Sequence, residues 1–344
     1  MARYILIRFL WMIPTFLGIT LISFLIIHMA PGDPAELMAG GGLGAGSGVG
    51  LSTENRAAVD QAVVQWREQF GLDRPLHEQY FVWLGHLFTL EFGESFKDHQ
   101  PVWNKMAERL PITILLNVLS ILLIYLVAIP LGIYSATHPY TAMDRLTTVG
   151  AFILFSLPTF WVAILAIVFL GGGDFLAVFP PGGLHATAYS ESWPWLRRAA
   201  DLGLHLFLPV LIMSYGGFAE LSRFMRGSLL EVLTQNYILT ARAKGLTERV
   251  VIYKHALRNS LVPMVTILAG ILPALIGGSV IIETIFSIPG IGQLGFQAVL
   301  ARDYPVIMAV FTMGAFVTLV SILLSDFLLT LVDPRISFGR RSAS

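Results

Sequence analysis

Only a few residues of this chain have the types and spacing that catalysis requires. Two carboxylates that share one proton can activate water for hydrolysis, and Asp174, which follows three glycines (171–173), and Asp326 are the available pair. Each lies at one end of a long apolar stretch, Asp174 on the outer side of a membrane and Asp326 on the inner side. We therefore expect most of a bilayer between them. An intramembrane aspartyl protease is a remote alternative, and a glycine-rich helix exit is the simpler interpretation.

Other ionisable residues in the apolar stretches lie near the ends of those stretches: His28, His205, Glu220, Glu283 and Asp326. There a side chain can reach headgroups or water, or pair with another helix. An ion-driven transporter would place a carboxylate in the middle of a span, and none occurs there. A stand-alone, ion-coupled secondary transporter is therefore the weaker alternative, although the sequence leaves it open.

Nucleotide and metal sites are not recognisable in the sequence. A phosphate-binding loop of the G-x-x-x-x-G-K-[ST] type needs a lysine after a glycine, but the four lysines follow Phe, Asn, Ala and Tyr. The chain has no cysteine and no H-E-x-x-H motif. We expect neither a catalytic residue nor a cofactor or metal in this chain.

The segment 237–263, YILTARAKGLTERVVIYKHALRNSLVP, has the composition of a docking element. Basic residues alternate with apolar ones, and Gly245 divides the segment into two short helical pieces, because glycine adopts positive φ without steric cost. A helix–glycine–helix element beyond the membrane fits a groove on another protein. The alternative, a basic loop that only fixes topology, needs neither the glycine nor the apolar residues.

The elements that position this segment follow from the composition. Of 344 residues, 55% are hydrophobic and only 13% are charged, against about 25% charged in soluble domains. Mean hydropathy is +0.72. Lysine plus arginine and aspartate plus glutamate each number 22, so no basic excess points to nucleic acid. These values predict an all-α integral membrane protein.

Six apolar stretches are long enough to cross a bilayer, which takes about 20 residues. They cover residues 9–29, 111–137, 146–173, 202–219, 259–282 and 304–325. The loop between the fourth and fifth stretches carries seven lysines and arginines, whereas the short loops on the other side carry two and one. Positive residues favour the cytoplasmic side. We therefore expect both termini in the cytoplasm of the cell.

The domains follow from this topology. Residues 1–30 form the N-terminal end and first span, 31–110 a helical extracytoplasmic segment, 111–335 a five-span transmembrane domain with a cytoplasmic loop at 223–262, and 336–344 a cytoplasmic tail. Within 31–110, residues 40–50 predict a flexible glycine-rich linker. Two amphipathic helices follow, the second with Leu76, Tyr80, Leu84, Leu87 and Phe88 on one side.

The basic segment resembles the cytoplasmic coupling loop of ABC-importer permeases, in the form T-A-R-A-K-G-L…H-A-L-R-N-x-L-x-P of the dipeptide/oligopeptide family. The matching residues are Thr240, Ala241, Arg242, Ala243, Lys244, Gly245, Leu246, His255, Ala256, Leu257, Arg258, Asn259, Leu261 and Pro263. The general importer motif has Glu-Ala-Ala where this chain has Leu-Thr-Ala (239–241), a departure shared by the peptide branch.

Further blocks agree with the same family, so that the resemblance covers nearly the whole chain. They are 31–34 (PGDP), 70–75 (FGLDRP), 283–292 (ETIFSIPGIG), 302–305 (RDYP) and 333–336 (DPRI). The glycine-rich linker, 92–95 (FGES) and the ending through Arg340 and Arg341 are most similar to the Yej-type branch, which imports oligopeptides and the peptide-nucleotide antibiotic microcin C.

The resemblance implies a type I ABC-importer permease in a bacterial inner membrane, working by alternating access. It implies a second homologous permease, two cytoplasmic ATPases that hold ATP and Mg, an extracytoplasmic solute-binding protein and a peptide substrate as partners. The ATPase contact is expected at Thr240–Leu246 with His255 and Arg258, where Arg242 and Lys244 make polar contacts and Leu246 is the apolar anchor. An outer gate or a contact with the binding protein is expected at Glu283, Phe286, Pro289, Asp303 and Tyr304.

Overall fold

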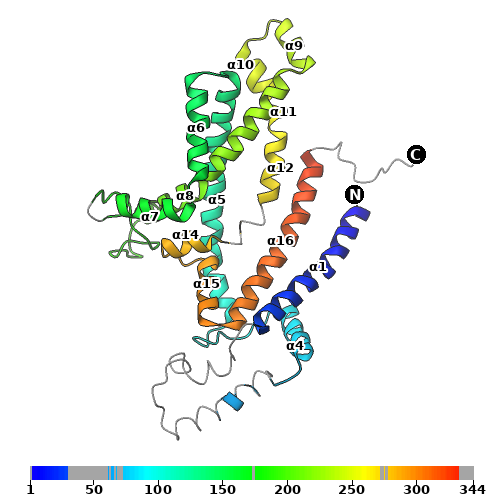
Figure 1. Cartoon of the computed structure of the whole chain (residues 1–344), viewed down its shortest axis with the longest axis vertical. Helices are drawn as coiled ribbons and strands as arrows, with labels where there is room; N and C mark the ends of the chain where they lie inside the picture. Colours follow the sequence, from blue (N-terminus) through cyan, green and yellow to red (C-terminus); the bar gives the residue numbers. More distant parts are fainter. Residues whose placement is uncertain are drawn as a thin grey trace. The chain divides into compact units, whose positions relative to one another are not determined.

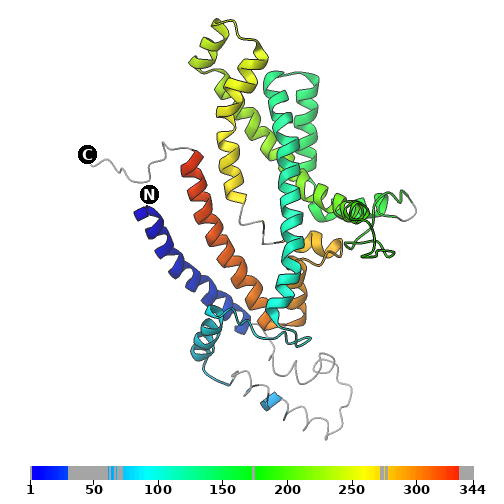
Figure 2. The ribbon, with the colours of Figure 1, turned by 180° about the vertical axis from the view of Figure 1, so that it is seen from behind.

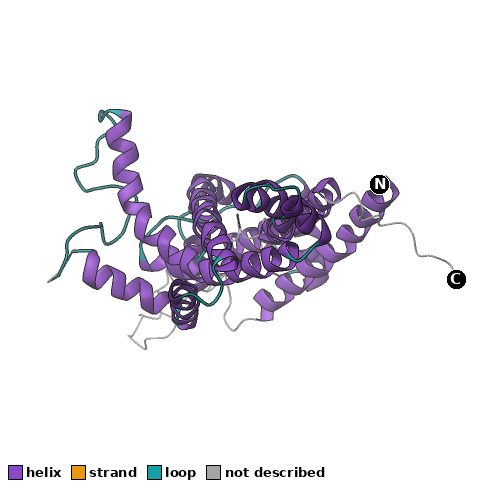
Figure 3. Cartoon of the chain, turned by 90° about the horizontal axis from the view of Figure 1, so that it is seen from above, coloured by secondary structure: helices purple, strands orange, loops and turns teal. Residues whose placement is uncertain are grey.

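The computed structural model describes residues 2–29, 61, 63–65, 67, 73–172, 175–271, 275 and 278–332. Within these residues the regular secondary structure is helical, without a strand (Figure 3). This agrees with the expected all-α class. The exit at 31–34, the glycine-rich linker, Asp174 and the tail at 336–344 lie outside the described residues.

The described residues form the following helices, in chain order. They are α1 (Ala2–Met29), α4 (Leu76–Phe88), α5 (Val102–Thr137), α6 (Ala142–Ser156), α7 (Thr159–Leu170), α8 (Trp195–Leu233), α9 (Asn236–Ala243), α10 (Glu248–Val250), the π-helix η1 (Val251–Ala256), α11 (Leu257–Ser260), α12 (Val262–Ile271), α14 (Val280–Ile285), α15 (Ile291–Ala301) and α16 (Tyr304–Val332) (Figure 1).

Four of these helices are long and apolar enough to cross a membrane. The spans are Leu6–Met29, Val102–Thr137, Trp195–Leu233 and Tyr304–Phe327. They coincide with the first, second, fourth and sixth expected stretches. The fifth stretch, 259–282, begins in α11 and α12 and then runs into residues outside the described part of the chain. A crossing there stays a prediction.

The third expected stretch, 146–173, is not one straight helix. It is divided into α6 and α7, which are bent by 98° at the break. The break lies at Leu157 and Pro158, because proline lacks an N–H and keeps the preceding residue out of the helical region. Leu157 has an extended backbone with ψ 129°, and its free carbonyl accepts a 2.6 Å hydrogen bond from the Tyr215 hydroxyl of α8.

The chain forms two compact units. One contains Met1–Arg8, Pro111–Gln293 and Thr318–Ser344, and the other contains Phe9–Leu110 and Leu294–Val317. In the first unit α5, α6 and α8 lie side by side in both views (Figures 1 and 2). Glycines bring α5 and α8 together: a Cβ at Gly132 would overlap Met225, and one at Gly217 would overlap Ile124. Small residues allow such close approach in membrane helices.

In the second unit α4 packs against α1. The Tyr80 hydroxyl lies 3.0 Å from Thr20 Oγ1, and its ring meets Phe24 edge to face. Leu84 and Leu87 are half-buried on the same side, as the amphipathic pattern predicts. Leu76 and Phe88, expected on that side as well, are exposed. They stand at the two ends of the helix, beyond the reach of α1.

Candidate functional site

The basic segment folds as two short helical pieces joined at Gly245. Gly245 has φ +77°, in the left-handed region, and its N–H donates to the Arg242 carbonyl at 2.9 Å. The Leu246 N–H reaches back to the Ala241 carbonyl at 3.4 Å. These bonds satisfy the last carbonyls of α9, as in other glycine-terminated helices. The expected helix–glycine–helix element is therefore present, at the far end of α8 (Figure 1).

One side of this element is part of the core of its unit. Its buried apolar residues pack with Met225 and Leu229 of α8 and Ile133 of α5. They are Ile238, Ala241, Val251 and Ala256. Ala241, expected among the ATPase-contacting residues, therefore faces inward, where it anchors α9. A displacement of the element must carry α5 and α8 with it, because packed cores do not deform continuously.

The other side of the element is exposed. Thr240, Ala243, Lys244, Leu246 and Arg258 are exposed, and His255 is half-buried. Leu246, at the tip, keeps 39% of its surface in solvent, which leaves it available as an apolar anchor in a partner protein. Arg242 and Gly245 are exposed as well, so that of the nine expected contact residues only Ala241 is buried.

Arg242 has an intrachain partner that sequence reasoning missed. Its Nε donates to Glu248 Oε1 at 2.8 Å and its Nη2 to Glu248 Oε2 at 3.3 Å, so this ion pair closes the turn around Gly245. A second link joins the two pieces, since Asn259 Nδ2 donates to the Tyr237 hydroxyl at 2.8 Å. The six-residue separation of Arg242 and Glu248 is not a helical spacing, which is why the pattern gave no signal.

The expected outer residues centre on Glu283, which is 1% exposed. Its Oε1 accepts from Thr113 Oγ1 at 3.2 Å and from the Ser279 N–H at 3.3 Å, and its Oε2 accepts from the Gln293 N–H at 2.8 Å. Thr113 Oγ1 in turn accepts from the Ile291 N–H at 2.8 Å. The carboxylate therefore ties the loop between α14 and α15 to α5.

Glycines make room for this carboxylate. A Cβ added at Gly290 would overlap the carboxyl group, and Cβ atoms at Gly278 or Gly292 would come within 3 Å of it. The interpretation that Glu283 reaches headgroups or water is wrong, because the surrounding loops enclose it. The same correction applies to His205, which is buried and bonds the Asp201 carbonyl through Nδ1 at 2.8 Å. Asp326 does pair with another helix, since Arg8 Nη2 lies 3.1 Å from its carboxylate.

Three more of the expected outer residues are buried. Phe286 is 1% exposed, Asp303 2% and Tyr304 9%. Asp303 accepts from Ser95 Oγ at 2.5 Å and from the Phe96 N–H at 3.1 Å. These side chains shape the loops and are not free to contact a partner. Pro289 alone of the five is exposed.

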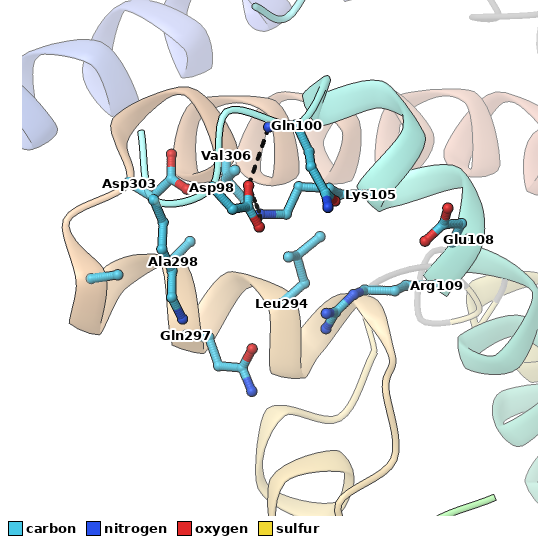
Figure 4. A pocket seen from close by; sticks show the side chains of 12 residues that line it. Asp98, Gln100, Lys105, Glu108, Arg109, Leu294, Gln297, Ala298, Asp303 and Val306 are labelled. Atoms are coloured by element: carbon cyan, nitrogen blue, oxygen red, sulfur yellow. Dashed lines mark hydrogen bonds and ion pairs between the residues drawn. The ribbon is translucent and has the colours of Figure 1, made fainter. Parts of the chain in front are cut away.

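Asp303 borders a polar cavity of ≈ 130 Å³ that the sequence did not reveal. Lys105 and Arg109 of α5 and Gln297 of α15 line it, together with Asp98 (Figure 4). Lys105 Nζ donates to Asp98 at 2.7 and 2.9 Å. Desolvation opposes the ionisation of Asp98, but hydrogen bonds from Lys105, Ser95 and Gln100 outweigh it and hold its pKa below the usual value. Arg109 Nη1 is buried without a partner in the described part of the chain.

Two family models match the chain. The model described as "Binding-protein-dependent transport system inner membrane component" matches residues 128–338. Its N-terminal companion, "Binding-prot-dependent transport system membrane comp, N-term", matches residues 1–117. Between them they cover the basic segment, the Glu283 loops and the polar cavity, apart from the part of α5 that separates the two matches.

Curated relatives align over almost the whole chain. The oligopeptide transport system permease protein AppB of Bacillus subtilis is 39% identical, over 98% of this chain and 100% of the relative. The inner membrane ABC transporter permease protein YejB of Escherichia coli O157:H7 is 36% identical, over 99% and 100%. The dipeptide transport system permease protein DppB of Lactococcus lactis is 34% identical, over 98% and 99%. The chain belongs to the binding-protein-dependent inner-membrane transport components, as a permease subunit of a peptide ABC importer and not itself an enzyme.

Proposed function

We propose that this permease pairs with a second, homologous permease and is driven by two cytoplasmic ATPases through the element 236–263. The observation that carries the proposal is the two-sided character of this element. Its exposed side presents Leu246 and Lys244, while its other side is packed into the α5 and α8 core. Such an element can follow a groove on a moving partner and transmit the motion to membrane helices.

Six spans with both termini in the cytoplasm give this element the required position. The four described spans and the bent pair α6–α7 support five crossings, and the stretch 259–282 supplies the sixth. The excess of lysine and arginine in the loop 223–262 favours the cytoplasm for that loop. Residues 31–110 then lie outside the cell, with the polar cavity and the Glu283 loops at the outer ends of the spans.

Alternating access needs two arrangements that the driving ligand binds with different affinity. ATP, with its Mg, binds between the partner ATPases and stabilises their closed form. The element 236–263 then moves with its groove, and α5 and α8 move with the element. Peptide passes from the solute-binding protein into a path between the two permeases, and hydrolysis restores the inward-open state. To shift the populations of the two arrangements from 1:99 to 99:1, ATP must bind the favoured one more tightly by about 5.5 kcal/mol.

On the outer side, we expect Pro289 and the mouth of the polar cavity to meet the solute-binding protein. Arg109 Nη1 is a buried donor with no partner within the described residues, and its positive charge at the cavity favours an acidic side chain of that protein at the mouth. Within the first unit, Glu283 and Phe286 hold the loop that carries Pro289. Within the second unit, Asp303 and Tyr304 hold the loops beside the polar cavity. We expect each set to contribute to the outer gate.

Co-purification from native membranes tests this proposal. Under mild detergent, the tagged chain should bring down a second permease and two ATPases, and the purified chain alone should hydrolyse no ATP. Peptide uptake into vesicles should require ATP and survive a protonophore. Uptake that collapses with the protonophore while ATP is held constant, or hydrolysis by the isolated chain, would contradict the proposal and favour a secondary transporter or an enzyme.

A further inference from the structure

A cavity of ≈ 230 Å³ lies between α5, α6 and α8, and none of its lining residues belongs to the basic segment or to the Glu283 loops. It is lined by Leu131 and Ser135 of α5, by Thr147, Thr148, Gly150, Ala151 and Leu154 of α6, and by Phe218, Ser222, Arg223 and Arg226 of α8. All three helices belong to candidate membrane spans. A lipid of the surrounding bilayer is therefore within reach of this cavity.

The lining is polar at one end of the cavity and apolar at the other. Each of the three helices contributes polar residues to the same end. On α5, Ser135 follows Leu131 by one turn, and on α8 Arg223 follows Phe218. On α6, which runs back from the α5–α6 turn, Thr147 precedes Leu154 by two turns. The polar ends meet in space, since Ser135 Oγ and Thr147 Oγ1 lie 3.3 Å apart. A cavity with this gradient matches an amphiphile, a polar head joined to an apolar chain.

The charge at the polar end is positive. The lining contains two arginines and no carboxylate, and Asp144 beside it balances only Arg226, at 3.3 Å from its Nε. Arg226 Nη2 donates to Asp144 Oδ2 at 3.4 Å, whereas the buried Nε makes an ion pair but no hydrogen bond within the described residues. The guanidinium carbon of Arg223 lies 5.4 Å from the centre of the Phe152 ring. Within the described residues Arg223 has no acidic partner. Basic pockets between membrane helices on the cytoplasmic side bind anionic lipid headgroups.

We propose that this cavity binds an anionic phospholipid of the inner leaflet, with its phosphate at Arg223 and Arg226 and the start of an acyl chain along Leu131, Leu154 and Phe218. The volume accommodates the phosphate end of the lipid, and the remaining chain stays in the surrounding bilayer. The assignment to the inner leaflet rests on the proposed topology, whereas the chemistry of the site does not depend on it. A lipid wedged between α6 and α8 would stiffen the helices that the element 236–263 moves.

Two substitutions test the site without rebuilding the fold. Arg223→Gln removes the unbalanced charge, and Arg145→Gln is its matched control, because Arg145 is an exposed arginine of α6 that does not line the cavity. Gly150→Leu fills the cavity, since a Cβ at Gly150 meets open space. Its control, Gly150→Ala, adds one methyl group and favours the helix.

The assembled importer is placed in nanodiscs of phosphatidylglycerol and phosphatidylethanolamine, and native mass spectrometry counts the lipids that it retains. We expect wild type to retain phosphatidylglycerol preferentially, Arg223→Gln to weaken that retention about fivefold, as expected for one positive charge, and Gly150→Leu to abolish it. Both controls should behave as wild type. Equal retention of the two lipids, or equal retention by Arg223→Gln and Arg145→Gln, would overturn the proposal. Loss of the ATPases from wild type would instead contradict the proposed function and leave the lipid result standing.

Discussion

Replacing Gly245 by valine is expected to reduce peptide uptake by the assembled importer at least tenfold, while the chain still inserts into the membrane at its normal level. Gly245 has φ +77°, and an L-residue in the left-handed region costs about 1–2 kcal/mol, more if it is β-branched. Because a tenfold change in an equilibrium corresponds to about 1.4 kcal/mol, this strain suffices to misplace Leu246. Proline, whose φ is fixed near −65°, should abolish uptake.

The neighbourhood of Gly245 separates backbone strain from steric overlap. A Cβ there would meet nothing within 4 Å, so a larger side chain has room and only the backbone conformation is at stake. Gly245→Asn should keep most of the uptake, because asparagine tolerates the left-handed region. Gly227→Ala is the matched control, since Gly227 lies in α8 and its Cβ would also meet open space. Wild-type uptake by well-expressed Gly245→Val would remove the coupling role of this turn.

Removing the Glu283 carboxylate should destabilise the folded chain by several kcal/mol. In Glu283→Ala the Thr113 hydroxyl and the N–H groups of Ser279 and Gln293 lose their acceptor. Each buried group left unsatisfied costs about 1–3 kcal/mol. We expect little monodisperse protein after detergent extraction, and a much lower thermal unfolding midpoint for what remains.

Two comparisons separate this effect from a general intolerance of carboxylate removal. Glu283→Gln keeps one carbonyl acceptor and should fall between wild type and Glu283→Ala. Glu220→Ala, at an exposed carboxylate of α8, should leave the midpoint unchanged. An unchanged midpoint for Glu283→Ala would show that the loop does not depend on this group.

The membrane class and most spans could be predicted, because a bilayer imposes a length and a composition that a sequence shows directly. The break between α6 and α7 was also visible in principle, since Pro158 stands inside the third apolar stretch. Proline is tolerated within membrane helices when neighbours satisfy the freed backbone groups, so its position alone does not distinguish a kink from a break. Here Tyr215, far along the chain, supplies that bond.

In the element 236–263, the local sequence determines some features of the site and distant packing determines others. The turn at Gly245 could be predicted because a single residue type permits it. The inward position of Ala241 and the Arg242–Glu248 pair depend on how α9 and η1 pack against α8, and no local spacing records that packing.

Long-range bonds explain why the outer residues were placed on a surface. The donors to Glu283 come from α5, from the residue before α14 and from α15, and those to Asp303 from residues some 207 positions away. A carboxylate near the end of an apolar stretch looks exposed until such partners are known. The polar cavity and the cavity between α5, α6 and α8 could not be predicted for the same reason, because residues far apart in the sequence line them.

In the assembled importer, Leu246 is expected to lie in a groove of a partner ATPase. Because the chain contains no cysteine, Leu246→Cys provides a single reactive thiol, and Ala301→Cys, an exposed position on α15, provides the control. A short cross-linker with one thiol-reactive end and one photoactivated end is attached to residue 246 or 301 of the functional importer in membranes and illuminated with and without ATP, so that the ATPase needs no cysteine of its own. The account predicts a product of this chain with an ATPase from residue 246 and none from residue 301. Importer that carries Leu246→Cys and still transports peptide could instead give no cross-link to an ATPase, with its thiol reacting only with lipid-phase or aqueous reagents. That result would contradict the placement of Leu246 in an ATPase groove.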